Sequence, residues 1–548
     1  MKRIIAVFLA AGLGVLSYAQ NLNPTVRITN TYKSGQEDGN KQYADIALPD
    51  SLTRFDYHFD YSVFDTPYRG AFEFSPYSVN LRPEAGLPES GRFFLRAGAG
   101  YGLHPQLQAV WSPLRKERFN LNVHQDFHGY YGKYRTVRKN LSDYPMWTTT
   151  GERYLGYDFS ELGGVDLRYS GRKSDVVFGV DYNGIFTNDE YAVNSFNSIV
   201  ARLGVKSNKE AWDKLRYDAS LTLDFATDAL SHPFEDRNLD QGALDLAAAL
   251  GPKLSDKFGI LIDARLKAVK YRGADNFAYS YLGFAVAPHV ALTLGPVDIL
   301  AGVKLDGTSQ VHFSPDVRAS MKIWEDKIKL VASVTGGTIF NTYSETKRDW
   351  HWFCPGLAET MTNGWENLNC NFGLQGRISR FLQYKLDGGW ASAGNLAMWG
   401  VRNVSGVLRP LLAYRDCNYA YANASLVWKS AHFDVDGNFR FRKSSLAGSA
   451  DVFDMPVASG DCRVAYNWNR RIYAGVRMEA ASPRGCTVSG VPMRLAGYVD
   501  LGVFGEFRIN SKWSVWVEGG NLLNQTVQLV PMHVENGISG TAGISLHL

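Results

Sequence analysis

The residues best suited to chemistry in this 548-residue chain are its cysteines and histidines. The five cysteines are Cys354, Cys370, Cys417, Cys462 and Cys486. None forms a C-x-x-C pair, so a structural zinc site is not indicated. The 11 histidines are dispersed, and no nucleophile elbow, H-E-x-x-H helix, P-loop or dinucleotide fingerprint stands in a supporting context. The sequence therefore predicts neither an enzyme nor a bound metal or cofactor.

The start of the chain indicates export. Lys2 and Arg3 precede an apolar run from Ile4 to Leu16, and Ser17-Tyr18-Ala19 offers a small-x-small cleavage site. This pattern is typical of a secretory signal peptide cut before Gln20. A retained membrane anchor is the disfavoured alternative, because the apolar run is short for a spanning helix. We expect residues 1–19 to be removed.

Export makes disulfide bonds chemically accessible. In the strand layout derived below, all five cysteines fall in outer loops or near the outer ends of strands. We predict at least one bridge that staples these loops, with Cys354–Cys370 or Cys417–Cys462 as the favoured pairs. The odd count leaves at least one thiol unpaired or bonded to another chain.

The stretch RDWHWFCP, residues 348–355, has the composition of a binding surface. Exposed tryptophan and arginine are common at the energetic centres of interfaces, so Arg348, Trp350 and Trp352 are candidates for an outer-loop contact with a ligand or partner. The favoured alternative is a loop folded onto the rim of the β-barrel that the strand pattern predicts, with its tryptophans packed or in the interfacial belt.

The elements that carry these residues follow one pattern from Phe93 onward. Segments of about 10 to 14 residues alternate between apolar and polar side chains, as in a strand with two unlike faces. In residues 432–442, HFDVDGNFRFR, phenylalanines and Val435 share one face and charged residues the other. Residues 217–225 and 499–509 alternate in the same way.

The connections between about 22 such segments alternate short and long. Short ones lie at 171–173, 295–297, 429–431, 469–471 and 510–512, and longer ones at 131–159, 341–365, 394–410, 445–459 and 525–536. This parity predicts an all-β fold: a closed transmembrane antiparallel barrel over residues 93–548, with both ends on the periplasmic side. The aromatic content of 13% suits the aromatic girdles of such barrels. The expected location is the bacterial outer membrane, with membrane lipid as a partner.

Net charge is +4, and both signs are interleaved along the chain. A nucleic-acid-binding protein needs a clustered basic patch, so no nucleic-acid partner is expected.

The C-terminal stretch VEGGNLLNQTVQLVP, residues 517–531, resembles the C-terminal signature of TonB-dependent outer-membrane receptors. The residues that match the family motif are Asn521, Leu522, Leu523 and Asn524. Together with NLNPTV, FDYSVFD, FEFSPY and LRAGAGYGLHPQLQAVWSP, the whole mature chain is similar to TonB-dependent-receptor-like barrels of the Bacteroidota.

The resemblance implies a transporter, but one part of the family's pattern differs. Family members carry a globular plug of well over a hundred residues and a TonB-binding segment, whereas only residues 20–92 lie between the signal peptide and the barrel. We therefore expect a barrel without a conventional plug and do not transfer TonB coupling to it. Two functions stay open: transport across the outer membrane, or a non-conducting scaffold that binds another exported or periplasmic protein.

Residues 20–92 form an N-terminal arm with an unusual stretch, FDYHFDYSVFD, residues 55–65. The aromatic side chains need burial, and the carboxylates need hydrogen-bond donors such as lumen residues Arg440, Arg442 and Arg508. We predict that the arm occludes the lumen as a reduced plug, with a periplasmic docking strand as the alternative. The candidate residues are Phe55, Asp56, Tyr57, Phe59, Asp60, Tyr61, Phe64 and Asp65.

Overall fold

The computed structural model describes residues 92–548, with gaps. The gaps are residues 102, 141–145, 189–191, 209–214, 232–235, 256, 274–277, 325–326, 356–360, 380, 405–406, 431, 447–451, 454, 470, 489–490 and 532. The side chains of residues 137–150, 401–411 and 486–493 also lie outside the description. The predicted signal peptide and N-terminal arm lie outside the described residues.

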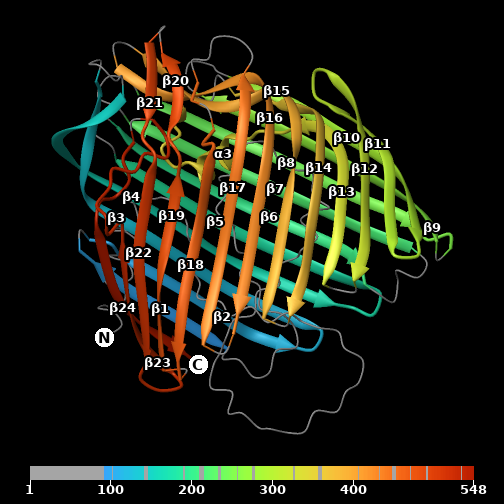
Figure 1. Cartoon of the computed structure of the whole chain (residues 1–548), viewed down its shortest axis with the longest axis horizontal. Helices are drawn as coiled ribbons and strands as arrows, with labels where there is room; N and C mark the ends of the chain where they lie inside the picture. The colour runs from blue at the N-terminus through green and yellow to red at the C-terminus, as the bar shows by residue number, and fades with distance from the viewer. Residues whose placement is uncertain are drawn as a thin grey trace.

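Antiparallel strands make up almost all of the described chain (Figure 1). The strands of its first half are β1 (Phe93–Gly100), β2 (Gln106–Lys116), β3 (Phe119–Asn140), β4 (Met146–Ser170), β5 (Ser174–Asn188), β6 (Val193–Ser207), β7 (Leu215–Ser231), β8 (Arg237–Pro252), β9 (Phe258–Gly273), β10 (Ala278–Leu294), β11 (Val297–Gly307) and β12 (Val311–Trp324). Those of its second half are β13 (Ile328–Ile339), β14 (Gly364–Ser379), β15 (Leu382–Val404), β16 (Val407–Lys429), β17 (Phe433–Leu446), β18 (Ala458–Trp468), β19 (Ile472–Ala481), β20 (Arg484–Val488), β21 (Val491–Leu495), β22 (Tyr498–Arg508), β23 (Trp513–Gly520) and β24 (Ser539–His547). The helix α3 (Tyr343–Asp349) interrupts the strands between β13 and β14.

The strands close into a barrel. β20 and β21 pair with each other as a hairpin, and β19 pairs directly with β22, so that 22 of the 24 described strands form the wall. The wall closes where β1 pairs with β24, from Phe94 opposite His547 to Gly100 opposite Thr541. The predicted 22-strand antiparallel barrel is confirmed.

The two faces of the wall differ as the alternation predicted. In β7, Phe225 is exposed while Asp224 is buried, and in β22 Val503 and Phe507 are exposed on one face. The exposed aromatic residues Trp324, Trp428, Trp468 and Trp513 stand at the ends of strands next to the short turns. Such an apolar exterior with an aromatic girdle is the surface of a bacterial outer-membrane barrel. Among the described residues, no helix is long and apolar enough to cross a membrane.

The connections alternate as predicted, but two predicted long loops are strand extensions. β3 and β4 pair as far as Asn140 opposite Met146, and β15 and β16 as far as Val404 opposite Val407. Residues 131–159 and 394–410 are therefore mostly hairpins. Their alternation is weak in sequence because strands that rise beyond the bilayer have no lipid-facing side to keep apolar. We call the end of the barrel that carries these hairpins the outer end, and the other the short-turn end.

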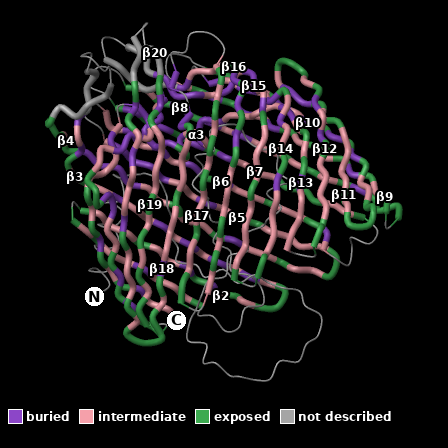
Figure 2. Tube along the Cα trace, viewed as in Figure 1, coloured by how far each residue is buried: buried purple, intermediate pink, exposed green. Residues whose placement is uncertain are grey.

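Buried side chains gather toward the outer end, around α3 (Figure 2). The largest buried cluster joins the loop that carries α3 to β3, β5, β6, β7, β8, β9, β15 and β16. The core of this barrel is therefore inside the lumen and close to one end.

Candidate functional site

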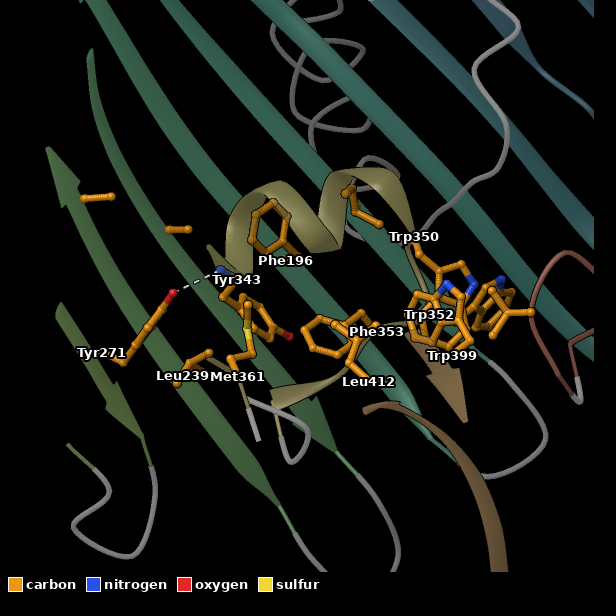
Figure 3. Close-up of a cluster of buried hydrophobic side chains, with 14 of the residues drawn as sticks. Phe196, Leu239, Tyr271, Tyr343, Trp350, Trp352, Phe353, Met361, Trp399 and Leu412 are labelled. Carbon is orange, nitrogen blue, oxygen red and sulfur yellow. Dashed lines mark hydrogen bonds between the residues drawn. The ribbon is translucent and has the colours of Figure 1, made fainter. Parts of the chain in front are cut away.

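The site is the loop of residues 340–363 between β13 and β14, which we call the inner loop. It folds into the lumen, where α3 lies against the inner face of the wall (Figure 3). Its last described aromatic residues reach β3, because Trp352 contacts Tyr134 with ring centroids 6.1 Å apart. β3 lies about ten strands from β13 around the wall. The inner loop therefore crosses the lumen rather than lying on the rim.

The helix of the inner loop follows from its local sequence. The hydroxyl oxygen of Thr342 caps it by accepting a hydrogen bond of 3.3 Å from the Glu345 backbone N–H. Glu345 stands in the first turn, and Lys347 and Arg348 in the last, which suits the helix dipole. The T-x-x-E pattern of residues 342–345 is a signal in the sequence from which the start of this helix can be predicted.

A buried polar network holds α3 to β6 and β7. Lys347 Nζ lies 3.5 Å from Asp228 Oδ2 and also donates to Asn194 Oδ1. Asp228 accepts further hydrogen bonds from Asn194 Nδ2, at 2.6 Å, and from the Tyr343 hydroxyl. Burial lowers the pKa of Lys347, and the Asp228 carboxylate opposes that shift. Charged groups buried like this are costly to separate.

A second set of polar contacts joins α3 to β7, β8 and β9. The Ser344 hydroxyl donates to Asp224 Oδ2 at 2.6 Å, and its backbone N–H donates to Gln241 Oε1 at 3.0 Å. Lys267 of β9 lies 3.0 Å from the Glu345 carboxylate. Both turns of this short helix are thus attached to β7, and its first turn also contacts β8 and β9.

The three residues predicted as an outer-loop contact lie inside the barrel. Arg348 pairs with Asp224 at 2.8 Å, while Trp350 and Trp352 are buried. Trp350 meets Trp399 of β15 with ring centroids 4.2 Å apart, and Trp352 stacks on His533 at 4.8 Å. The tryptophans are therefore packed, as the favoured alternative expected, but in the lumen rather than on the rim.

His351, which stands between these two tryptophans in the sequence, is also buried. Its Nδ1 lies 3.7 Å from Asp158 Oδ1 of β4. Burial, with a further contribution from the charge of Lys347, holds the pKa of His351 well below its usual range, so that the imidazole is neutral. Among the described residues, no group of three or more histidine, cysteine, aspartate or glutamate side chains is arranged to hold a metal ion.

The motif residues 521–524 have a structural role in the described chain. Asn521 is buried, with a φ of 44°, and its side chain donates to the carbonyls of Gln525 and Asn536 at 2.8 and 3.1 Å. Asn524 has a φ of 52° and accepts a hydrogen bond from Arg135 of β3. Asparagine tolerates this left-handed backbone better than most residues. Leu522 and Leu523 are exposed.

Neither predicted disulfide is formed among the four cysteines whose side chains are described. Cys370 shares the outer face of β14 with the exposed Phe372. Cys354 follows α3 inside the lumen, where it interacts electrostatically with Lys347. The barrel wall separates these two thiols.

The other predicted pair is wrong for the same reason. Cys417 is buried on the inner face of β16, whereas Cys462 stands on the outer face of β18 opposite the exposed Met478. Their partners on the intervening β17 are Leu446 and Gly437, nine positions apart. That separation is roughly 30 Å, far beyond disulfide reach. The strand layout predicts that both cysteines lie near the outer end, but it does not predict the face of the wall on which each one stands.

The fold and the inner loop together define the class of protein: an outer-membrane β-barrel whose lumen is crossed by one of its own loops. The chain matches no known family and no curated protein. Among solved structures, it is similar to the FrpB iron transporter of Neisseria meningitidis, with a TM-score of 0.63 and 8% identity over 84% of this chain and 82% of that chain.

Two further structures are similar to a comparable degree. The copper transporter OprC has a TM-score of 0.57 and 11% identity over 84% of this chain and 80% of that chain. The siderophore receptor PirA from Acinetobacter baumannii has a TM-score of 0.58 and 10% identity over the same shares. At these identities the likeness is one of fold: this chain shares the barrel architecture of outer-membrane transporters and receptors.

Proposed function

We propose that this protein moves a hydrophilic solute across the outer membrane through its lumen, and that the inner loop is a closure that must move for passage. The observation that carries the proposal is the nature of the attachment. Charged and hydroxyl groups such as Lys347, Ser344 and Glu345 hold the loop to polar side chains of the wall. Water that enters the lumen can replace these polar partners and so lower the cost of separating the buried charges, which leaves the apolar contacts of the loop as the remaining barrier.

The similar solved structures support a transport role, because OprC and FrpB are transporters and PirA is a siderophore receptor. In the proposal, the N-terminal arm acts at the short-turn end as a reduced plug. Energy coupling through TonB forms no part of the proposal.

Planar-bilayer conductance tests the proposal. The ends of the inner loop are adjacent, since the Asn341 backbone N–H donates to Asn363 Oδ1 at 3.0 Å. Residues 342–362 can therefore be replaced by a short glycine linker with little strain on the wall. We expect this variant to conduct more than the mature chain, and the loop-excised variant without residues 20–92 to conduct most. A lumen that stays closed in both variants overturns the proposal.

A scaffold is the alternative function, and the tall hairpins favour it. β3–β4 and β15–β16 extend beyond their neighbours at the outer end, and β20–β21 adds a separate hairpin there (Figure 1). Such a rim offers backbone that another exported protein could contact. Purification from native membranes distinguishes the two: a stoichiometric partner together with a non-conducting loop-excised barrel supports the scaffold.

A further inference from the structure

The inner loop places its two cations against aspartates of the wall. Lys347 Nζ lies 3.5 Å from Asp228 Oδ2, and Arg348 Nη2 lies 2.8 Å from Asp224 Oδ2. Asp224 and Asp228 both face the lumen from β7, and four residues along a strand span about 13 Å. The wall therefore holds two cationic groups of the loop at two separate positions.

A neutral side chain of β6 completes each position. Asn194 Oδ1 accepts a hydrogen bond from Lys347 Nζ, and Ser198 Oγ accepts one of 3.2 Å from Arg348 Nη1. The first position thus fits an ammonium group and the second a guanidinium group. We call the four wall residues Asn194, Ser198, Asp224 and Asp228 the acidic wall.

The two aspartates of the acidic wall depend on the inner loop for their counter-charges. In the described structure, the Asp224 carboxylate accepts hydrogen bonds from Ser344 and Arg348 of the loop and from no strand. Asp224 is buried, and its Oδ1 has no hydrogen-bond partner among the described residues. Lys347 is the one cation within salt-bridge distance of Asp228 in the same part of the chain. The acidic wall is thus a place for cations that the wall itself does not supply.

Several other carboxylates of the lumen are neutralised by strands of the wall. Such pairs are Asp181 with Arg202, Asp245 with Arg265, Asp306 with Lys304, and Asp316 with Arg318. Displacement of the inner loop would leave these pairs intact and would expose Asp224 and Asp228, which are ionised in water at neutral pH. Lys267 would also lose its loop partner Glu345, but its Nζ lies 3.9 Å from Asp245 Oδ2. The open lumen would therefore be negative at the acidic wall.

We propose that the acidic wall binds an organic cation with at least two amine or guanidinium groups, and that Lys347 and Arg348 occupy this site as a tethered substitute for the solute. The inference rests on the proposed function and names the class of solute that the lumen takes. Solute and loop compete for the same carboxylates. A ligand that binds only when the loop is displaced shifts the population towards that state, so the solute favours its own passage.

Isothermal titration calorimetry with spermine, a linear polyamine, tests the site in detergent at low salt. The loop-excised variant exposes the acidic wall, whereas α3 fills it in the unchanged mature chain. We expect spermine to bind the loop-excised variant at least about tenfold more tightly, because the unchanged chain offers the site only in the fraction of molecules whose loop is displaced. Equal affinity of the two proteins, or no binding to the loop-excised variant, overturns the inference.

Removal of the two carboxylates tests their role. Asp224→Asn with Asp228→Asn, made in the loop-excised variant, should weaken spermine binding roughly tenfold, the loss expected for two partly exposed ion pairs. The matched control is Asp436→Asn with Asp461→Asn, which makes the same change on β17 and β18, about ten strands from β7 around the wall. The control should leave the affinity unchanged. An equal loss in both variants would mean that spermine responds to the overall charge of the lumen, and the inference would be wrong.

A second variant keeps the whole chain. Lys347→Ala with Arg348→Ala vacates both positions and should also bind spermine more tightly than the unchanged chain; an affinity equal to that of the unchanged chain would contradict the role of the two residues as a tethered substitute. The heat-dependent shift in electrophoretic mobility confirms that each variant still forms the barrel. Planar-bilayer conductance separates this inference from the proposed function: spermine binding by a barrel that never conducts removes only transport, and conductance without spermine binding removes only the cation site.

Discussion

Lys347 Nζ lies 3.5 Å from Asp228 Oδ2, and neither side chain is exposed to solvent. The two residues are 119 positions apart in sequence, on α3 and on β7. Their contact attaches the inner loop to the wall at β7, so that the loop and the wall are stabilised together.

Removal of the Lys347 charge should release the inner loop. Lys347→Met leaves Asp228 buried without its cation, which costs about 3–5 kcal/mol. We expect faster proteolysis within residues 340–363 and a higher conductance than that of the unchanged chain. The control is Lys347→Met combined with Asp228→Asn, which removes both charges and should recover most of the protection. Equal protection of the single variant and the unchanged chain would contradict the role of this pair.

The loop of residues 521–538 should loosen as pH rises. Burial, with further contributions from Glu479 and Asp500, raises the pKa of Glu535 from 4.5 to about 8. A raised pKa in an acid means that the packed loop binds a proton more tightly than the open loop. The stabilisation is therefore complete below pH 4.5 and is lost as pH rises to about 8.

Hydrogen exchange measures this effect. Protection factors, which correct for the intrinsic pH dependence of exchange, should fall for residues 521–538 between pH 5 and pH 9, values that bracket the shifted pKa of about 8. Glu535→Gln keeps the shape but cannot ionise, so its protection factors should stay level over the same interval. A parallel fall in that variant would assign the loosening to another group.

The sequence was sufficient for the barrel because its signal is local. Alternation along each strand and the parity of the turns depend only on neighbouring residues, as in β17, where Phe439 and Arg440 face opposite sides. The same reasoning overestimated loops where strands rise beyond the bilayer, because the wall there loses its apolar face.

The inner loop could not be placed from sequence for the opposite reason. Its position depends on contacts of Lys347 with Asp228 of β7 and of Trp352 with Tyr134 of β3, and the partners in each pair are distant in the chain. Aromatic residues in a long connection suit an exposed contact and a packed core equally well. The choice between an exposed contact and a packed core depends on where the strands of the closed barrel lie around the loop.

The thiols of Cys354, Cys370, Cys417 and Cys462 should not form disulfides with one another. Cys370 and Cys462 stand on the outer face of the wall, and Cys354 and Cys417 inside it. Digestion under non-reducing conditions followed by mass spectrometry should find no peptides linked between any two of these four cysteines. A Cys354–Cys370 link would require the inner loop or β14 to lie elsewhere.

The seam between β1 and β24 offers a last test of how the barrel closes. Gly98 and Gly543 are directly opposite each other, and the buried ring of Trp516 covers both. A Cβ atom at position 543 would lie 2.1 Å from the Ala97 carbonyl oxygen and 2.5 Å from the Trp516 ring. The backbone of the seam cannot yield, so Gly543→Ala should cost about 1–3 kcal/mol.

The matched control is Gly540→Ala in the same strand, where an added Cβ meets nothing within 4 Å. The temperature at which the folded band converts to the unfolded band in electrophoresis should fall for Gly543→Ala and stay unchanged for Gly540→Ala. Equal temperatures for the two variants would mean that the seam tolerates a Cβ under Trp516, and that β1 and β24 are not held in this register. The comparison tests closure itself, because both glycines lie on the strand that completes the barrel and only one faces the seam's tryptophan.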